Sequence, residues 1–148
     1  MIDIRPYRDT DRPAVVAIWE RCGLTRPWND PGRDIARKQA VDDGLFLVAV
    51  HSGDAVGDEA VVGSAMFGYD GHRGWVNYLA VDPDHQGQDI ARTLMDRGEE
   101  MLIRLGCPKL NLQVRSDNRN AIAMYRRLGY DVDDVVSLGK RLIPDPSP

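Results

Sequence analysis

The sequence has 148 residues, the length of one domain, which is enough to bury roughly 70% of the surface that the unfolded chain exposes. Its 43% hydrophobic and 28% charged residues exclude a largely disordered or low-complexity protein. A net charge of −4 excludes a broad basic surface, so we expect neither nucleic acid nor a membrane as a partner and favour a cationic or small neutral substrate.

The two cysteines show no pattern typical of a metal or disulfide site. Cys22 and Cys107 lie far apart and match no CxxC spacing, so we interpret both as reduced thiols. Residues 1–13 lack an apolar signal core, and no apolar run reaches the ~18 residues that a membrane helix needs. We therefore expect a cytoplasmic protein without a metal in its site.

The chain opens with a predicted strand and two predicted helices. Residues 1–7 alternate polar and apolar side chains, as strands do. A cap-like Asp11 and a stop at Gly23 predict the first helix. Asp30 supplies the N-cap of a second helix, which ends near Gly44.

Three strands and a long helix follow. Residues 45–50, 60–69 and 75–81 are strand-like runs separated by turn-rich stretches, so we expect a meander. Apolar side chains recur at helical spacing over residues 89–105, and Gly106 ends this helix.

The C-terminal part predicts a strand, a helix and a last strand. Residues 109–114 place apolar side chains on one face, and residues 118–129 form a helix closed by a glycine. Residues 135–143 are strand-like, with Gly139 as a bulge.

The element order βααβββαβαβ predicts an α+β fold with one central mixed, mostly antiparallel sheet flanked by helices. No linker or repeat interrupts this order. We expect one domain over residues 1–143 and a flexible C-terminal tail over residues 144–148.

Two motifs and the element order resemble the N-acetyltransferase (GNAT) family over nearly the whole chain. The first motif begins at Gln86 and Gly87, and Asp89 stands where the family has glycine. Segments such as "RPWNDP" and "SLGKRLI" are similar to its small bacterial YpeA-like subgroup. The resemblance implies a single-domain GNAT fold and an enzyme that uses acetyl-CoA. The second motif consists of Asn118, Ala121, Tyr125, Leu128, Gly129 and Tyr130.

The residues that follow the middle strand suit a diphosphate-containing cofactor. The first N–H groups of a helix lack partners, and the helix dipole favours an anion there. The preceding strand would present its main chain to the pantetheine arm, as one strand does to another. We therefore expect acetyl-CoA to contact Leu79, Ala80, Val81, Gln86, Gly87, Gln88, Asp89, Ile90, Ala91 and Arg92. The resemblance adds Asn118, which otherwise caps the last helix.

Asp89 is the departure from the family motif. Aspartate tolerates left-handed backbone, so the turn can form without glycine. As an N-cap, however, its carboxylate would accept from the N–H of Ala91 or Arg92 and so compete with the diphosphate, while Arg92 and Arg97 would offset its charge. The alternative is a plain N-cap with no ligand nearby.

Tyr125 is the candidate catalytic residue. The resemblance implies that its phenol protonates the departing thiolate, and the alternative is a core aromatic on an amphipathic helix. Neither cysteine belongs to a Cys/His arrangement, so we expect direct transfer without a covalent enzyme intermediate.

The general base is not evident from the sequence. A related branch of the family, the ribosomal-protein alanine acetyltransferases, has glutamate where Gln113 stands, and the other usual site falls near Trp75. An amide cannot take the proton. The candidates are Asp30, Asp70, His72, or a water relay through Asn77 and Tyr78, although "DGHRG" also reads as a plain polar turn.

By the same resemblance, the loop with Trp28 and Asn29 faces the acceptor. An aromatic ring beside Asp30 would hold an amine by cation–π and charge pairing, or Trp28 is a packed lid on the second helix. Trp19 has helical spacing to neighbouring valines and is expected in the core.

The leading hypothesis is an acetyl-CoA dependent N-acetyltransferase acting on a primary amine of a small molecule, peptide or protein. The alternative is a GNAT-fold module that binds CoA or a partner without turnover, because Asp89 and Gln113 depart from the family pattern. A dinucleotide-binding fold fails because no G-x-G-x-x-G follows a first strand. Exposed sheet edges also suggest a homodimer.

Overall fold

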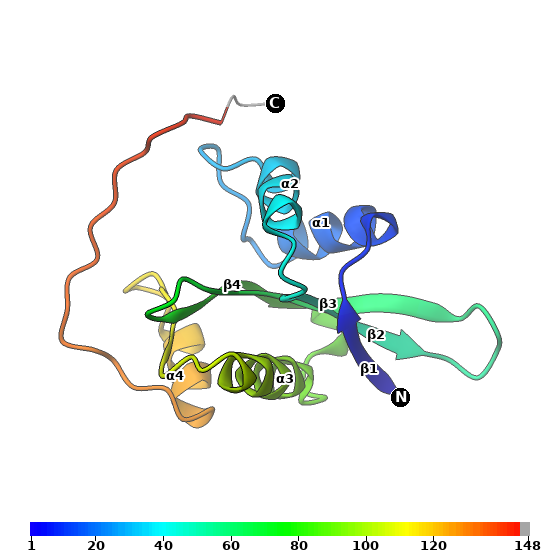
Figure 1. The fold of residues 1–148 in the computed structure, drawn as a ribbon. Coiled ribbons are helices and arrows are strands. Elements are labelled where there is room, and N and C mark those ends of the chain that lie inside the picture. The colour runs from blue at the N-terminus through cyan, green and yellow to red at the C-terminus, as the bar shows by residue number, and fades with distance from the viewer. Residues whose placement is uncertain (146–148) are drawn as a thin grey trace.

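Five strands form one sheet in the computed structural model, which describes residues 1–145 (Figure 1). The strands follow one another in chain order; the first four pair antiparallel, and the last pair is parallel. This arrangement confirms the predicted α+β class with a mixed, mostly antiparallel sheet. The strands are β1 (Ile2–Pro6), β2 (Phe46–Ser52), β3 (Glu59–Tyr69), β4 (Gly74–Val81) and β5 (Leu110–Asn111).

Four helices cover the two faces of the sheet. Helices α1 and α2 lie on one face, and α3 and α4 lie on the other (Figure 1). No helix within residues 1–145 combines the length and the apolar composition needed to cross a bilayer. The helices are α1 (Arg12–Arg21), α2 (Pro31–Val41), α3 (Ile90–Arg104) and α4 (Arg119–Arg127).

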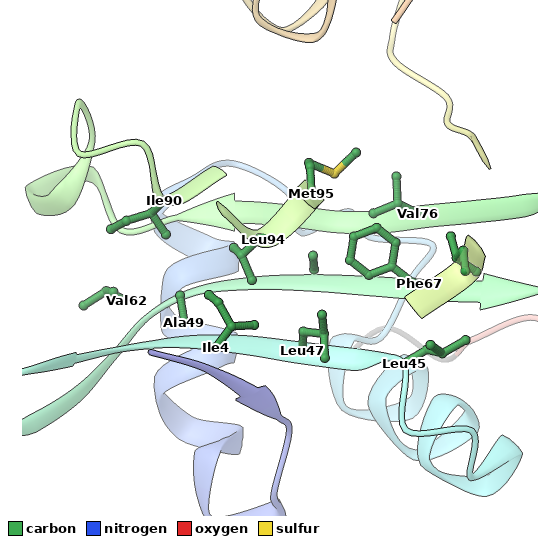
Figure 2. Packing of buried hydrophobic residues seen from close by; sticks show 12 residues of the cluster. Ile4, Leu45, Leu47, Ala49, Val62, Phe67, Val76, Ile90, Leu94 and Met95 are labelled. Atoms are coloured by element: carbon green, nitrogen blue, oxygen red, sulfur yellow. The ribbon is translucent and has the colours of Figure 1, made fainter. Parts of the chain in front are cut away.

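Strand β2 is buried on both faces because helices lie on both sides of it. Leu47 and Ala49 belong to a core cluster with α3, whereas Phe46 and Val48 belong to a second cluster with α1 and α2. This alternation follows the period of two in a strand. Figure 2 shows the first cluster, where Ile90, Leu94 and Met95 of α3 lie against side chains of the strands.

One glycine brings α3 close to the sheet. A Cβ atom built on Gly98 would lie 2.1 Å from the ring of Phe67, which is fully buried. No side chain larger than hydrogen fits at this distance without displacing the ring. Gly98 therefore sets the separation between α3 and β3.

The second cluster contains a polar link that fixes an irregularity in β4. The indole N–H of Trp19 donates to Ser64 Oγ at 2.9 Å, and Ser64 Oγ donates to the carbonyl of Tyr78 at 2.8 Å. The register between β3 and β4 shifts here, and Tyr78 has a left-handed backbone with φ of 54°. Trp19 is fully buried, as predicted for a core residue.

The predicted cap is confirmed at α2; at α1 the helix and its stop at Gly23 are confirmed, but the predicted cap is wrong. The carboxylate of Asp30 accepts from the N–H groups of Gly32 and Arg33, which makes Asp30 the N-cap of α2. Asp11 precedes α1 but makes no side-chain cap bond. Its carboxylate instead accepts from the Arg5 guanidinium and the Arg8 N–H, because the ion pair with β1 turns it away from the helix.

The predicted last strand is wrong. Residues 135–143 are exposed and form no strand, and their backbone makes no backbone hydrogen bond within the described part of the chain. An alternating pattern does not by itself make a strand, because a ladder also needs a partner strand. The predicted strand over residues 109–114 is likewise reduced to the two residues of β5.

The predicted tail, residues 144–148, lies only partly within the described residues. Of this range, the structure describes residues 144 and 145. Asp145 is buried and accepts hydrogen bonds from the Asp30 N–H and the Arg37 guanidinium. The boundary between domain and tail stays a prediction.

We predict that Gly98→Ala destabilises the protein. The added methyl must displace Phe67, and overpacking of this kind costs about 1–3 kcal/mol, which outweighs the gain of up to about 1 kcal/mol in helix propensity. Urea denaturation would measure the change. The double variant Gly98→Ala with Phe67→Leu should lose less stability than the sum of the losses in the two single variants, because the smaller leucine side chain makes room for the added methyl. An increase in stability for Gly98→Ala alone would contradict the packing argument.

Candidate active site

A cavity of about 1380 Å³ opens where β4 and β5 part. These strands pair only at Gly74 with Leu110 and at Trp75 with Asn111. Beyond this point, the β4 edge that faces β5 has no strand partner among residues 1–145. The cavity is lined by the free part of β4, the turn before α3, the chain after β5, one side of α4 and the segment from α1 to α2.

Most of the predicted cofactor residues line this cavity. Leu79, Ala80 and Val81 lie on the open edge of β4, and Asn118 lies at the start of α4. From the turn before α3 the lining includes Gln86, Gly87, Asp89, Ile90, Ala91 and Arg92, whereas Gln88 is absent from it. Residues far apart in the sequence are thus brought to one opening.

The first turn of α3 carries unpaired amides. The N–H groups of Ile90, Ala91 and Arg92 make no hydrogen bond to any residue within 1–145, and the first helical bond runs from Thr93 to the carbonyl of Asp89. Ile90 is buried and fixes the start of the helix in the core. Together with the helix dipole, these amides form an anion-binding position.

Asp89 does not cap α3, so the predicted competitor bond is wrong. Its backbone is left-handed, with φ of 59° as its tolerance of this region predicted, and its carboxylate makes no cap hydrogen bond. An N-cap residue usually has an extended backbone, which aims the side chain at the helix amides. The left-handed turn therefore leaves the amides free, although the negative charge remains beside them.

Two arginines of α3 near this turn face different parts of the molecule. Arg92 lines the cavity, as expected. Arg97, one turn further along α3, donates instead to the carbonyl of Ile4 at 3.4 Å, so it faces β1 and cannot offset the charge of Asp89.

Tyr125 projects from α4 to the same cavity. Asn118 caps this helix, since its side-chain oxygen accepts from the Ala121 N–H at 3.2 Å. Burial raises the pKa of Tyr125 to about 12, so the phenol is protonated at neutral pH. Its hydroxyl makes no hydrogen bond to the described residues, and its ring meets Tyr130 edge to face at 6.0 Å between centroids. The tyrosine therefore offers a proton at the cavity wall.

Trp28 and Asn29 also line the cavity. The Trp28 side chain is 51% exposed, so it is not a packed lid. Arg115 lies over its ring at 5.6 Å from the centroid, so one face of the ring already carries a cation of the protein. Asn29 accepts from Arg141 at 2.7 Å.

Three of the predicted acceptor and base residues lie outside this cavity. Asp30 is used as the cap of α2. Asp70 accepts from the N–H groups of His72 and Arg73 at 2.8 and 2.7 Å, and these bonds, that of Arg73 first, hold the Asp70 pKa below its usual range. His72 is exposed in the same turn. These bonds support the polar-turn interpretation of "DGHRG", and neither Asp70 nor His72 lines this cavity.

The sequence reasoning missed Asp34. It lies on α2, lines the cavity, and accepts from the hydroxyl of Tyr78 at 2.5 Å and from Arg37 at 3.1 Å. Burial and then the bond to Asp34 raise the Tyr78 pKa well above its ordinary value, so this phenol is protonated. The contact of Asp34 with Tyr78 joins residues 44 apart, so no local sequence signal indicates it.

Cys22 also lines the cavity but has no role as a nucleophile. Its thiol donates to the carbonyl of Val81 at 3.3 Å, and burial raises its pKa. A nucleophilic cysteine needs a lowered pKa, usually from a neighbouring histidine or helix start. Cys22 and Cys107 are both free, as predicted.

Comparisons with known proteins agree with this geometry. The sequence matches the acetyltransferase (GNAT) family over residues 12–130. An acetyltransferase of Pectobacterium atrosepticum is 51% identical over 144 residues, which cover 97% of this chain and 98% of that protein.

Two solved structures share the fold. Ard1 of Thermoplasma volcanium has a TM-score of 0.76 at 22% identity, covering 89% of this chain and 84% of that one. A predicted acetyltransferase of Clostridium acetobutylicum, solved with acetyl-CoA, has a TM-score of 0.67 at 18% identity, covering 94% and 96%. Since the family match spans most of the sequence and the Pectobacterium relative nearly all of it, the chain belongs to the acetyltransferase (GNAT) family.

Proposed function

We propose that this acetyltransferase moves the acetyl group of acetyl-CoA directly to a primary amine. The observation that carries the proposal is the free first turn of α3, which lies at one cavity with the open edge of β4 and the phenol of Tyr125. The Clostridium acetobutylicum protein, which shares the fold, was solved with acetyl-CoA. The two free thiols fit a reducing compartment, so we place the reaction in the cytoplasm.

The cofactor would bind along the wall formed by β4 and α3. The diphosphate accepts from the amides of Ile90, Ala91 and Arg92, and the Arg92 side chain adds a positive charge. The pantetheine arm lies along the edge from Leu79 to Val81 and pairs with its main chain as an added strand would. This path leads the thioester toward Tyr125.

The transfer needs a balanced set of proton movements. The neutral amine attacks the thioester carbonyl, forms a C–N bond and passes through a tetrahedral intermediate. The C–S bond then breaks, and Tyr125 gives its proton to the thiolate. Free main-chain N–H groups of β4 stabilise the oxyanion. The remaining step is removal of one proton from the attacking nitrogen.

We propose that Asp34 takes up this proton, which reaches it through the hydroxyl of Tyr78. The Tyr78 hydroxyl lies at the cavity and already donates to the Asp34 carboxylate at 2.5 Å. It accepts the proton of the amine as its own proton moves to Asp34, so no Tyr78 phenolate forms. The proton on Asp34 then leaves to solvent, and solvent returns a proton to Tyr125, which restores both groups. This relay replaces the glutamates that the sequence lacks at Gln113 and Trp75.

The acceptor end of the cavity favours an amine that also carries an anionic group. Arg26 and Arg115 line it, and neither forms an ion pair with a described residue. Lys38 and Arg37 line it as well, but aspartates neutralise them. This differs from the cationic or neutral substrate that the net charge favours, because the charge near the site is not the average charge of the chain.

Thiol release from acetyl-CoA would test the function with a panel of amino acids, phosphorylated amino sugars, peptides and polyamines. Turnover with at least one primary amine is the expected result, and anionic amines should give the highest kcat/KM. Tight CoA binding by calorimetry without any turnover would instead support a binding module. Turnover of polyamines alone would support the transferase function but contradict the assignment of an anionic amine as the acceptor.

We predict that Tyr125→Phe lowers kcat by about 100-fold, the usual size of a general-acid contribution, with little change in the Kd of CoA. Because burial raises the pKa of Tyr125 to about 12, wild-type kcat should not fall through loss of this proton until the pH approaches that value. Tyr69→Phe, on β3 outside the cavity, is the matched control. Equal losses in kcat and in CoA affinity would assign Tyr125 to binding or packing.

We predict that Asp89→Gly and Asp89→Asn both tighten CoA binding by about tenfold, because each removes a negative charge beside the diphosphate. Both residues tolerate the left-handed backbone, and no cap bond is lost. Calorimetry would give the affinities, with Asp58→Asn on the β2–β3 loop as the charge control. Tightening by glycine alone would show that the backbone, and not the charge, limits binding.

We predict that Asp34→Asn and Tyr78→Phe each lower kcat by about 100-fold at neutral pH and leave CoA affinity unchanged. Asp42→Asn, at the exposed C-terminal end of α2, is the control. If either variant keeps the wild-type rate, the proposed relay is wrong, whereas the transferase assignment is unaffected.

A further inference from the structure

The C-terminal segment, defined as residues 131–144, is exposed along its whole length and forms neither helix nor strand, with bends at Asp134, Leu142 and Ile143. It runs from α4 past the open side of the sheet toward α2 (Figure 1). Within residues 1–145, its main chain makes no backbone hydrogen bond. Apolar side chains are nevertheless frequent and highly exposed, at 67% to 92%, and they are Val132, Val135, Val136, Leu138, Leu142 and Ile143. Exposed apolar side chains gathered along one segment are typical of an interface.

Odd-numbered positions of the C-terminal segment hold it to its own chain. Asp133 pairs with Lys109 at 2.8 Å, and Ser137 accepts a hydrogen bond from Gln113. Arg141 donates to Asn29 at 2.7 Å. Both of the first two contacts join residues 24 apart, so the segment runs parallel to the chain after β5, linked to it by side chains only.

Even-numbered positions make no hydrogen bond or ion pair with residues 1–145. In extended backbone, alternate side chains point to opposite sides. The side-chain hydrogen bonds and ion pairs of the C-terminal segment within residues 1–145 therefore come from its odd-numbered side, where Val135 and Ile143 stay exposed; we call the even-numbered side, which forms none, the free side. The free side carries Val132, Asp134, Val136, Leu138, Lys140 and Leu142.

We infer that this segment pairs antiparallel with the same segment of a second copy, about a two-fold axis at Ser137. The free side is complementary to itself under this operation. Val136 lies opposite Leu138, and Asp134 lies opposite Lys140, while Val132 lies opposite Leu142. Each apolar side chain meets an apolar one, and each charge meets its opposite.

Other pairings of the two segments are less favourable. A parallel, in-register pair would place Asp134 opposite Asp134 and Lys140 opposite Lys140. A shift of two residues in the antiparallel pair would place Asp134 opposite Leu142 or Leu138. Only the axis at Ser137 matches every free position, which is why the sequence selects a second copy of this chain as the partner.

The pairing also satisfies the main chain of the segment. Its N–H and C=O groups have no backbone partner, and a second antiparallel segment supplies both. Gln113, which lines the cavity, bonds to Ser137 at the axis. The interface therefore adjoins the acceptor end of the cavity, although its formation does not depend on catalysis.

The test is the oligomeric state of the full chain by sedimentation equilibrium and native mass spectrometry. A dimer is expected for the wild type. Asp134→Lys and Lys140→Asp should each weaken it by about tenfold or more, because every dimer then contains two like-charge pairs. The double variant Asp134→Lys with Lys140→Asp should restore it, and mixing the two single variants should give heterodimers.

Ile103→Lys is the control for a change at an exposed apolar residue, since Ile103 is 70% exposed on α3 away from the segment. It should dimerise as the wild type does. Circular dichroism should show every variant folded, because all these positions are exposed. A monomeric wild type at micromolar concentration, or single charge variants that dimerise like the wild type, would overturn the inference.

Discussion

The separation of β4 from β5 is the constraint on which the site depends. Beyond Trp75, the β4 edge that faces β5 keeps no strand partner among the described residues, and this free edge and the cavity arise from the same feature. The hydroxyl of Ser64 fixes the irregularity of β4, since it accepts from Trp19 and donates to the carbonyl of Tyr78. Bulges of this kind bend a strand and redirect a side chain, often beside an active site. Here the redirected residue is Tyr78, whose hydroxyl meets Asp34.

The two faces of the sheet contribute different halves of the site. Helix α3 brings its free amides from one face, and its distance from the sheet is set by the contact of Gly98 with Phe67. Helix α2 brings Asp34 from the other face. Substrates approaching from opposite faces meet only at a sheet edge, because an intact sheet would keep them apart. The open edge of β4 is therefore both a binding surface and the passage between the two halves.

Whether a feature of the fold or the site could be predicted from the sequence depends on how far apart in the chain its interacting residues lie. The cap at Asp30 and the burial of Trp19 follow from neighbouring residues, and the sequence predicts both. The link from Asp34 to Tyr78 joins residues 44 apart and depends on a bulge, so no local pattern contains it. Asp89 failed as a cap because a left-handed backbone, itself predicted, turns the carboxylate away from the helix.

The last strand failed for a different reason. Alternation of side chains is only one requirement of a strand, because pairing depends on another strand at the right place. The charges of the segment indicate where that strand comes from, since Asp134 and Lys140 lie at equal distances from Ser137. A segment that paired only with other residues of its own chain would gain nothing from this symmetry. Two copies related by a two-fold axis gain two attractive pairs, so the same residues that misled a single-chain interpretation specify the dimer.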